Sequence, residues 1–363
     1  MKILYDHQMF DAQVYGGISR YFANLISGIG KYDRIETEAS VLYTNNHYLK
    51  GKVKSHIGRL LAQSVFSKPR KLRAWNKNYS KMRISRGQFD IFHPTYFHPY
   101  FLKFLRKPFV LTVHDMIYEL FPGYFQSTDL TAEYKRKLVT AANHIIAISE
   151  TTKKDLMRLL DVPEEKITVV YHGYQSVDRT TDPLLNLPEK YLLFVGSRDN
   201  YKNFDTFAAA FALVKKSHPD LKAVCVGGGD FTQEEAALFS KLQITDSVMQ
   251  ININDRDLYW IYKKALAFVY PSLYEGFGLP ILEAFDANCP VISSDISCFR
   301  EVAGDASVYF DPQDAQVMAN TIMETVDDPM LRKGLLLNGE KRLANFTMEK
   351  CLSGTLDVYR KVC

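Results

Sequence analysis

The feature of this 363-residue sequence that most constrains its fold is an alternation of short apolar segments with helical segments, which occurs twice. Short apolar strands that alternate with helices form parallel sheets. The chain is also longer than one typical α/β domain. We therefore predict an α/β protein with two Rossmann-like, doubly wound parallel-sheet domains. The predicted strands lie at residues 2–5, 38–43, 91–94, 108–114, 144–149, 167–171, 191–196, 223–226, 248–253, 267–270 and 290–293.

A boundary between the two domains is predicted at residues 174–190. These residues are largely polar, include prolines and show no apolar periodicity, as is typical of a linker. We therefore expect one domain over residues 1–173 and a second over residues 191–347. Ligands of doubly wound sheets bind outside the carboxyl ends of the strands, so the expected ligand site is a cleft between the two domains.

Hydropathy and cysteine content restrict the cellular compartment. No run of 18 or more uncharged apolar residues occurs, so no membrane-spanning helix is expected. The start of the chain reads as a strand followed by Asp6 rather than as a signal peptide. The number of cysteines is odd and no C-x-x-C pair occurs, which argues against a disulfide framework and a structural zinc site. These features favour a cytoplasmic protein. The five cysteines are Cys225, Cys289, Cys298, Cys351 and Cys363.

A strongly basic segment interrupts the first half. Between Ala39 and Phe89 there is no Asp or Glu, and apolar side chains are interleaved with the basic ones. This pattern favours contact of residues 50–86 with an anionic membrane surface or a lipid-linked acceptor. A soluble pair of basic helices with a buried face is the alternative. No nucleic-acid-binding signature occurs, so no nucleic-acid partner is expected. The basic residues are Lys50, Lys52, Lys54, Arg59, Lys68, Arg70, Lys71, Arg73, Lys77, Lys81, Arg83 and Arg86.

The strongest chemical signal is the segment 270–284. A buried strand is followed by a glycine-containing loop and by a helix with Pro280 in its first turn. Such a loop presents backbone N–H groups and the positive end of a helix dipole, which suit a pyrophosphate. With an eight-residue offset, Glu275 and Glu283 are both expected on the cleft side, one near a sugar and the other near a ribose. The loop residues expected to contact the ligand are Gly276, Phe277, Gly278 and Leu279.

This segment resembles the E-x7-E motif of retaining GT-B glycosyltransferases, specifically of glycosyltransferase family 4. The similarity continues through PVISSD and REVAGDA to Asp305, and weaker likeness covers nearly the whole chain. The resemblance implies a GT-B fold and a retaining, metal-independent glycosyl transfer from a nucleotide sugar. It also implies that Glu275 contacts the transferred sugar, that Glu283 binds the ribose, and that a final helix at 348–363 crosses back to the first domain.

A second motif, VGSRDNYKN, follows the first strand of the second half. A guanidinium binds a diphosphate bidentately and an ammonium acts as a compact charge, so Arg198 and Lys202 are candidates to bind one. In the family, an Arg and a Lys at this place bind the donor phosphates and neutralise the leaving group. The R-x3-K-N spacing resembles a branch with mannosyl- and rhamnosyl-type enzymes, which favours GDP-mannose over UDP-sugars. The turn 227–229 is expected near the nucleotide base.

Two features of the first half fit the same family. Gly16 and Gly17 follow the first strand, and glycines there let backbone N–H groups approach a phosphate or sugar. They resemble the N-terminal G-G loop of the family. His114 ends a predicted strand at the place where the family has a His beside the transferred sugar. His93 and His98 are expected on the acceptor side. No metal-ligand pattern of histidines occurs, so no metal and no cofactor besides the donor is expected.

The sequence thus predicts a retaining transferase that moves a hexose, with mannose from GDP-mannose preferred, to a lipid-linked oligosaccharide or polysaccharide precursor. Such an acceptor would place the protein in the cytoplasm, peripherally at the inner face of the plasma membrane, in lipopolysaccharide or polysaccharide biosynthesis. Two alternatives remain open. A nucleotide-sugar epimerase of GT-B fold would convert the donor without an acceptor, and a non-catalytic glycan-binding protein would show no turnover.

Overall fold

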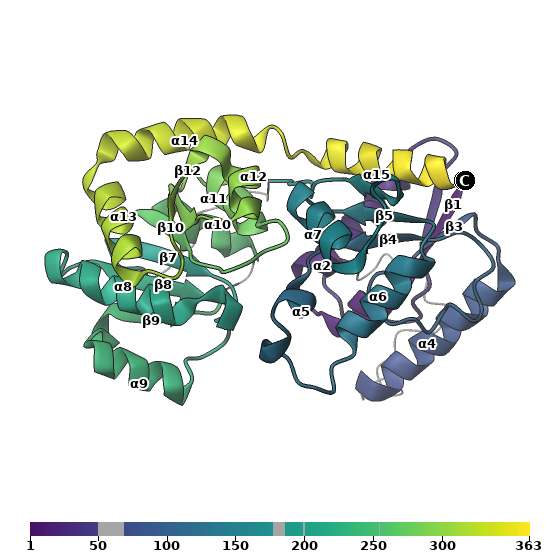
Figure 1. The fold of residues 1–363 in the computed structure, drawn as a ribbon, viewed down its shortest axis with the longest axis horizontal. Coiled ribbons are helices and arrows are strands. Elements are labelled where there is room, and N and C mark those ends of the chain that lie inside the picture. The colour runs from purple at the N-terminus through teal and green to yellow at the C-terminus, as the bar shows by residue number, and fades with distance from the viewer. Residues whose placement is uncertain (50–68, 177–185, 199, 254) are drawn as a thin grey trace. The chain divides into compact units, whose positions relative to one another are not determined.

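The computed structural model describes residues 1–49, 69–176, 186–198, 200–253 and 255–363. The chain forms two compact units. Unit 1 comprises Met1–Gly173 and Met348–Cys363, and unit 2 comprises Tyr174–Thr347. Each unit contains parallel strands and helices (Figure 1), which confirms the predicted α/β class with two Rossmann-like domains.

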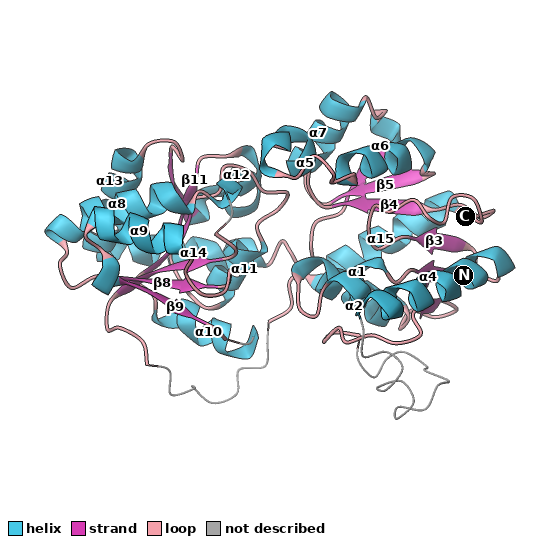
Figure 2. Cartoon of the chain, turned by 90° about the horizontal axis from the view of Figure 1, so that it is seen from below, coloured by secondary structure: helices cyan, strands magenta, loops and turns pink. Residues whose placement is uncertain are grey.

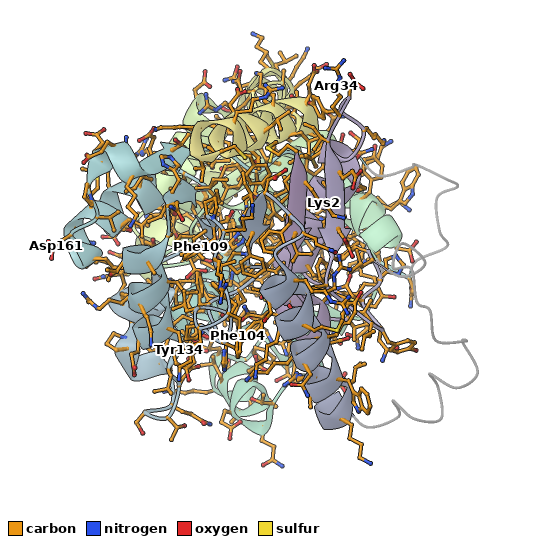
Figure 3. The ribbon with its side chains drawn as sticks, turned by 90° about the vertical axis from the view of Figure 1, so that its right-hand side faces the viewer. Lys2, Arg34, Phe104, Phe109, Tyr134 and Asp161 are labelled. Atoms are coloured by element: carbon orange, nitrogen blue, oxygen red, sulfur yellow. The ribbon has the colours of Figure 1, made fainter. Side chains whose placement is uncertain are left out.

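Unit 1 contains two three-stranded parallel sheets with the orders β2-β1-β3 and β4-β5-β6. An isolated parallel bridge between Phe92 and Phe109 joins them, and the Phe92 N–H donates to the Pro108 carbonyl at 3.0 Å. Phe109 is buried in the interior of this unit (Figure 3). The strands are β1 (Lys2–Tyr5), β2 (Glu36–Ala39), β3 (Ile91–His93), β4 (Val110–Val113), β5 (His144–Ala147) and β6 (Ile167–Val169).

The strand predicted at 38–43 is wrong at both ends, because β2 begins at Glu36 and ends at Ala39. The Ser40 N–H still donates to the Tyr5 carbonyl of β1 at 2.8 Å, but from Leu42 on the backbone bonds to a side chain of a helix instead of to a strand. The Oδ1 atom of Asn76 accepts from the Leu42 N–H at 2.9 Å. A buried amide therefore ends the strand four residues earlier than the apolar pattern indicates.

Seven α-helices lie in the described part of unit 1. Helix α2 begins at Gly17, and α7 is capped by Ser149, whose Oγ accepts from the Thr152 N–H at 2.9 Å. Helix α15 contacts α2, β4 and β5 (Figure 1) and buries Tyr359 in the core. The helices are α1 (Gln8–Ala12), α2 (Gly17–Ile29), α4 (Pro69–Arg86), α5 (Ile117–Leu120), α6 (Thr131–Ala141), α7 (Glu150–Leu160) and α15 (Met348–Val362).

Unit 2 is organised around one six-stranded parallel sheet with the order β12-β11-β10-β7-β8-β9. The central strands are continuous apolar runs, as expected of strands covered on both faces. The edge strand β12 was not predicted. The strands are β7 (Tyr191–Val195), β8 (Lys222–Val226), β9 (Val248–Ile251), β10 (Ala267–Tyr270), β11 (Val291–Ser294) and β12 (Ser307–Phe310).

Helices cover both faces of this sheet. Figure 2 shows α8 and α9 on one side of β8 and β9, and α10 on the other. Aromatic packing fixes the α8 face: the rings of Phe194 and Phe204 lie 5.0 Å apart edge to face, and Phe207 stacks at 5.7 Å from Phe194. The helices are α8 (Phe204–Ser217), α9 (Gln233–Leu242), α10 (Asp255–Lys264), α11 (Leu279–Asp286), α12 (Ser297–Ala303), α13 (Ala315–Asp327) and α14 (Pro329–Leu343).

No helix of the described residues is long and apolar enough to cross a membrane. Of the basic segment, residues 50–68 lie outside the described residues, and the rest belongs to α4. Four of the five cysteines are buried free thiols, and Cys363 is exposed.

Candidate functional site

The loop after β10 and the start of α11 form the centre of the candidate site. Gly278 adopts φ +104°, a conformation that favours glycine, and it directly precedes α11. Pro280 lies in the first helical turn, as predicted. The Cys298 thiol, on α12, donates to the Phe277 carbonyl at 3.0 Å and thereby fixes the loop. The N-terminus of an eight-residue helix is thus presented in a fixed conformation.

Glu275 and Lys202 lie in direct contact. The Lys202 Nζ atom is 2.5 Å from Glu275 Oε1, and the Ser272 hydroxyl donates to the same oxygen at 2.8 Å. Both side chains of the ion pair are mostly buried. Burial and the neighbouring Glu275 carboxylate hold the pKa of Tyr270 well above its usual range, so the phenol stays protonated. The two motifs that the sequence singles out therefore meet at one point.

Backbone contacts explain why Lys202 reaches Glu275. Lys202 ends a short 3-10 helix at Asn200–Lys202, whose Tyr201 carbonyl accepts from the Leu273 N–H at 2.8 Å. The next residue, Asn203, donates from Nδ2 to the carbonyls of Pro271 (3.0 Å) and Pro312 (2.6 Å). The segments that carry the two charged side chains are thereby tied to each other.

Arg198 has a different environment from Lys202. Its Nε donates to Glu235 Oε1 at 2.5 Å, and its terminal nitrogens donate to the carbonyls of Gly227 (2.7 Å), Gly229 and Asp230 (both 3.0 Å). The side chain is 4% exposed. A Cβ atom at Gly228 would lie 2.7 Å from the Arg198 guanidinium. Arg198 therefore holds the glycine turn 227–229 after β8.

Glu283 lies on α11, and its Oε2 atom accepts from the Tyr262 hydroxyl at 3.4 Å. Burial, followed by the charge of Glu283, raises the pKa of Tyr262 well above its usual range. Tyr262 is fully buried on α10 and stays a hydrogen-bond donor. The carboxylate is thus oriented by a phenol that cannot ionise near neutral pH.

His114 follows β4 in unit 1 and is surrounded by aromatic rings. It stacks on His172 with ring centroids 5.6 Å apart and meets the edge of Tyr21 at 5.2 Å. Burial lowers the pKa of His114 to about 3, with smaller contributions from His93 and Lys135. Its Nε2 atom is buried without a hydrogen-bond partner among the described residues. At neutral pH His114 is a neutral imidazole that can donate or accept one hydrogen bond.

The glycine pair of unit 1 lies at the start of α2. Gly16 precedes the helix in an extended conformation, and Gly17 is its first residue. A Cβ atom at Gly16 would lie 2.3 Å from the Gln13 side chain, which accepts from the Ser19 N–H at 3.1 Å. The side chain of Gln13 therefore satisfies one free amide of this helix start, and Gly16 leaves it the space to do so.

Comparison with known proteins identifies the family. The family model described as Glycosyltransferase Family 4 matches residues 15–176, and that described as Glycosyl transferases group 1 matches residues 180–342. The O-antigen chain mannosyltransferase RfbU of Salmonella typhimurium is 30% identical over 248 residues, which cover 64% of this chain and 69% of that protein. The chain belongs to glycosyltransferase family 4. The predicted resemblance is thereby confirmed.

Other relatives of this family 4 glycosyltransferase agree with that assignment. The O-antigen chain mannosyltransferase B of Escherichia coli is 26% identical over 266 residues, which cover 69% of this chain and 70% of that protein. Among solved structures, sucrose-phosphate synthase from Thermosynechococcus elongatus has a TM-score of 0.72 at 20% identity, covering 99% of this chain and 98% of that one. Anabaena HepE in complex with UDP and glucose has a TM-score of 0.73 at 17% identity, covering 98% of each chain. The fold is GT-B, as predicted.

The glycosyltransferase also contains residues that the sequence motifs did not reveal. Lys135, on α6, is fully buried, and its Nζ donates to Glu119 Oε2 at 2.7 Å and to the Asp115 carbonyl at 2.9 Å. It thereby fixes the backbone directly after His114.

His93, expected on the acceptor side, is buried in the core between the Tyr359 hydroxyl (2.6 Å) and the Thr112 hydroxyl (2.9 Å). An isolated Lys or His in a sequence carries no signal for either environment.

Proposed function

We propose that this glycosyltransferase transfers mannose from GDP-mannose to a lipid-linked oligosaccharide or polysaccharide precursor, with retention of configuration and without a metal ion. The contact between Lys202 and Glu275, four residues before the start of α11, carries the proposal, because it brings a cation and a carboxylate together beside a helix N-terminus. The names of the relatives RfbU and mannosyltransferase B, both O-antigen mannosyltransferases, support mannose as the sugar.

In this proposal unit 2 binds the donor. Lys202 and the amides around Gly278 hold the diphosphate, which the positive end of the α11 dipole also attracts. Glu283 binds the ribose hydroxyls, and Glu275 binds hydroxyls of the transferred sugar. The acceptor oxygen bonds to the anomeric carbon as the bond from that carbon to the diphosphate breaks. The departing diphosphate oxygen takes the proton of the acceptor hydroxyl, and Lys202 stabilises the charge that develops there.

We assign Arg198 two roles. Its positive charge lies next to the Lys202 motif and supports diphosphate binding, and its guanidinium fixes the turn 227–229, which we place near the nucleotide base. For a direct phosphate contact, the guanidinium must release part of its ion pair with Glu235.

In this proposal unit 1 binds the acceptor and also contributes contacts to the transferred sugar of the donor. Neutral His114 donates or accepts one hydrogen bond at the transferred sugar, and the backbone at Gly16 and Gly17 approaches the same ligand. A neutral imidazole suits a hydroxyl partner, since no charge has to be desolvated when the two meet.

A peripheral position at the inner face of the plasma membrane is the last part of the proposal. The outer side of α4 has Trp75, which is 53% exposed, and Met82 one heptad later. Lys81 Nζ lies 5.4 Å from the ring centroid of Phe104, which is also exposed (Figure 3). Exposed apolar side chains among basic ones favour an anionic lipid surface.

A screen of nucleotide sugars tests the proposal. Thermal shift and turnover are measured with GDP-mannose, UDP-glucose, UDP-N-acetylglucosamine and UDP-galactose in EDTA, with Glu275→Ala and Lys202→Ala alongside. We expect GDP-mannose to stabilise the wild type and to be slowly hydrolysed, and both variants to lose these effects. Conversion of the donor to another sugar nucleotide without hydrolysis would indicate an epimerase. A wild type that binds none of the donors would indicate a glycan-binding protein instead.

A further inference from the structure

A buried histidine–aspartate pair lies in unit 1, immediately after β1. The His7 Nδ1 atom is 2.6 Å from Asp11 Oδ2, and their side chains are only 8% and 3% exposed. His7 stands between the last residue of β1 and the first residue of α1, and Asp11 follows one helical turn later. Neither residue belongs to a motif of the sequence analysis.

Neighbouring side chains hold both His7 and Asp11 in place. The second carboxylate oxygen of Asp11 accepts from Asn76 Nδ2 at 2.6 Å, and Asn76 is itself fully buried and bonded to the Leu42 and Tyr43 backbone. The His7 ring packs against Tyr100, with ring centroids 5.3 Å apart. The imidazole therefore has one fixed orientation.

The other ring nitrogen of His7 has no partner in the part of the chain that the structure describes. Its Nε2 atom is buried and makes no hydrogen bond to any described residue. In the neutral tautomer whose Nδ1–H donates to the Asp11 carboxylate, the ring directs a lone pair from Nε2, as in the catalytic triads of hydrolases. A buried acceptor of this kind is uncommon in native proteins unless a ligand or another donor completes it.

The position of His7 indicates which kind of ligand completes it. Ligands of parallel α/β sheets bind outside the carboxyl ends of the strands, where His7 follows β1. A lone pair requires a donor, which a sugar hydroxyl offers and an ionised phosphate or carboxylate does not. Tyr100, His98 and Tyr134 add rings on this side of unit 1, since the His98 ring lies 5.9 Å from Tyr100 and 5.2 Å from Tyr134.

We propose that His7 Nε2 accepts a hydrogen bond from a hydroxyl of a neutral pyranoside acceptor, and that Asp11 and Asn76 are positioning residues for His7. The inference rests on the proposed function, because it assumes transfer to a glycan, and it adds the chemical class and one contact of the acceptor.

Matched substitutions separate this role from a structural one. The amide of His7→Asn retains a donor to Asp11 and loses the distal acceptor, whereas His7→Gln places an amide oxygen near the Nε2 position. Asp11→Asn removes the carboxylate that sets the tautomer. His218→Asn, on the surface of unit 2, is the control for losing an imidazole elsewhere. Thermal unfolding shows which of these variants fold.

The probes are the octyl pyranosides of mannose, glucose, galactose, rhamnose and N-acetylglucosamine. Their binding to each full-length variant is measured by saturation-transfer NMR without a donor. Transfer to the bound glycoside and acceptor-free hydrolysis are then measured with GDP-mannose. We expect His7→Asn and Asp11→Asn to raise KM for the glycoside roughly three- to ten-fold, the worth of one hydrogen bond. His7→Gln should restore much of this loss, and donor hydrolysis should not change.

Each outcome decides the proposal. It is overturned if no octyl pyranoside binds the wild type, or if folded His7→Asn binds the glycoside as the wild type does. It is also overturned if the substitutions lower donor hydrolysis as much as transfer. Failure of the proposed donor looks different, because the wild type would then bind a glycoside through His7 but would neither bind nor hydrolyse GDP-mannose.

Discussion

At the scale of single residues, the charged groups of the candidate site are held by partners in their own unit. Lys202 contacts Glu275, and Arg198 contacts Glu235 together with three backbone carbonyls. Side chains that are fixed before a ligand arrives lose little conformational freedom on binding. The two cations differ in their partners. The Lys202 ammonium is paired with the carboxylate that we propose to bind the sugar, whereas the Arg198 guanidinium supports the turn 227–229.

Removal of the Arg198 guanidinium tests its structural role. Arg198→Met leaves Glu235 as a mostly buried carboxylate without its partner, a change that costs about 3–5 kcal/mol. We expect the free energy of unfolding of unit 2 to fall by about this amount in urea denaturation. Trp260 fluorescence in a Trp75→Phe background reports on this unit.

The matched control for Arg198→Met is Arg300→Met. Arg300 is paired with Asp295, but these two side chains are 54% and 48% exposed. An exposed pair contributes about 0–1 kcal/mol, so this variant should unfold almost as the wild type does. Equal, small effects of both substitutions would contradict the role that we give to Arg198.

Buried histidines make the stability of unit 1 dependent on pH. Burial lowers the pKa of His93 and of His114 to about 3, and that of His172 well below its usual range. Below pH 6.5 the unfolded chain takes up protons that the folded unit does not. The stability is therefore complete above pH 6.5 and is lost as the pH falls toward 3, by about 1.4 kcal/mol per pH unit for each histidine.

Urea denaturation at pH 7.5, 5.5 and 4.5 measures this dependence. Trp75 fluorescence in a Trp260→Phe background reports on unit 1. We expect His114→Asn to reduce the slope between pH 5.5 and 4.5 by the contribution of one histidine, whatever its effect on stability at neutral pH. A slope that is the same in wild type and variant would show that His114 is protonated in the folded protein.

At the scale of elements, the start of α11 depends on Gly278. A side chain there would occupy φ +104°, and its Cβ would lie 3.2 Å from the rings and methyl groups of Phe299 and Ile281. We expect Gly278→Ala to lower the free energy of unfolding by about 1–2 kcal/mol and to weaken donor binding by moving the backbone at the start of α11. Differential scanning calorimetry and donor titration measure the two effects.

A glycine-to-alanine substitution at Gly334 should have the opposite effect on stability. Gly334 lies inside α14, and its Cβ would meet no atom within 4 Å. Alanine is favoured over glycine in a helix by about 1 kcal/mol, so this variant should be more stable and should bind the donor normally. If Gly278→Ala also stabilised the protein, the loop geometry described for Gly278 would be wrong.

The exposed side of α4 leads to a prediction about membranes. A Trp75→Ser, Met82→Ser double variant should lose most of its binding to vesicles that contain anionic lipid, because it removes exposed apolar groups and retains every basic one. Cosedimentation with anionic and with neutral vesicles at low and high salt measures this. Wild-type protein that fails to bind anionic vesicles would contradict the peripheral position.

The sequence predicts the central strands well and two of the edge strands poorly, for a physical reason. Strand β10 coincides with its prediction at 267–270, because a parallel strand buried on both faces is a continuous apolar run. Strands β2 and β12 lie at sheet edges, and the half-exposed ETEA of β2 has no such run. The sequence pattern singles out Lys202 and Glu275, and the structure pairs them. The contact of Arg198 with Glu235 joins residues 37 positions apart, which no local pattern contains. His7 and Asp11 have the local i,i+4 spacing, but their burial depends on tertiary neighbours.

At the scale of the whole molecule, the chain completes unit 1 with its last residues. Unit 2 is the continuous segment 174–347, whereas unit 1 needs both ends of the chain. The two crossing segments lie side by side, since the Tyr174 N–H donates to the Phe346 carbonyl at 2.7 Å. The side chains of Tyr174 and Ser176 both donate to Asp286 on α11. The crossing segment at 174–176 is thus attached to the helix that carries Glu283.

This topology predicts that α15 is part of the unit 1 core rather than a tail. The Tyr359 hydroxyl bonds to His93 Nδ1 at 2.6 Å and to the Tyr5 hydroxyl at 2.8 Å, and Leu356 is buried beside them. Deletion of residues 348–363 exposes this core and leaves buried polar groups without partners, each costing about 1–3 kcal/mol. We expect the truncated chain to lose the unfolding transition of unit 1, which Trp75 fluorescence reports. It should keep the unfolding transition of unit 2, which Trp260 fluorescence reports. Deletion of the exposed Cys363 alone should change neither, and a truncated chain that kept both transitions would show that unit 1 folds without α15.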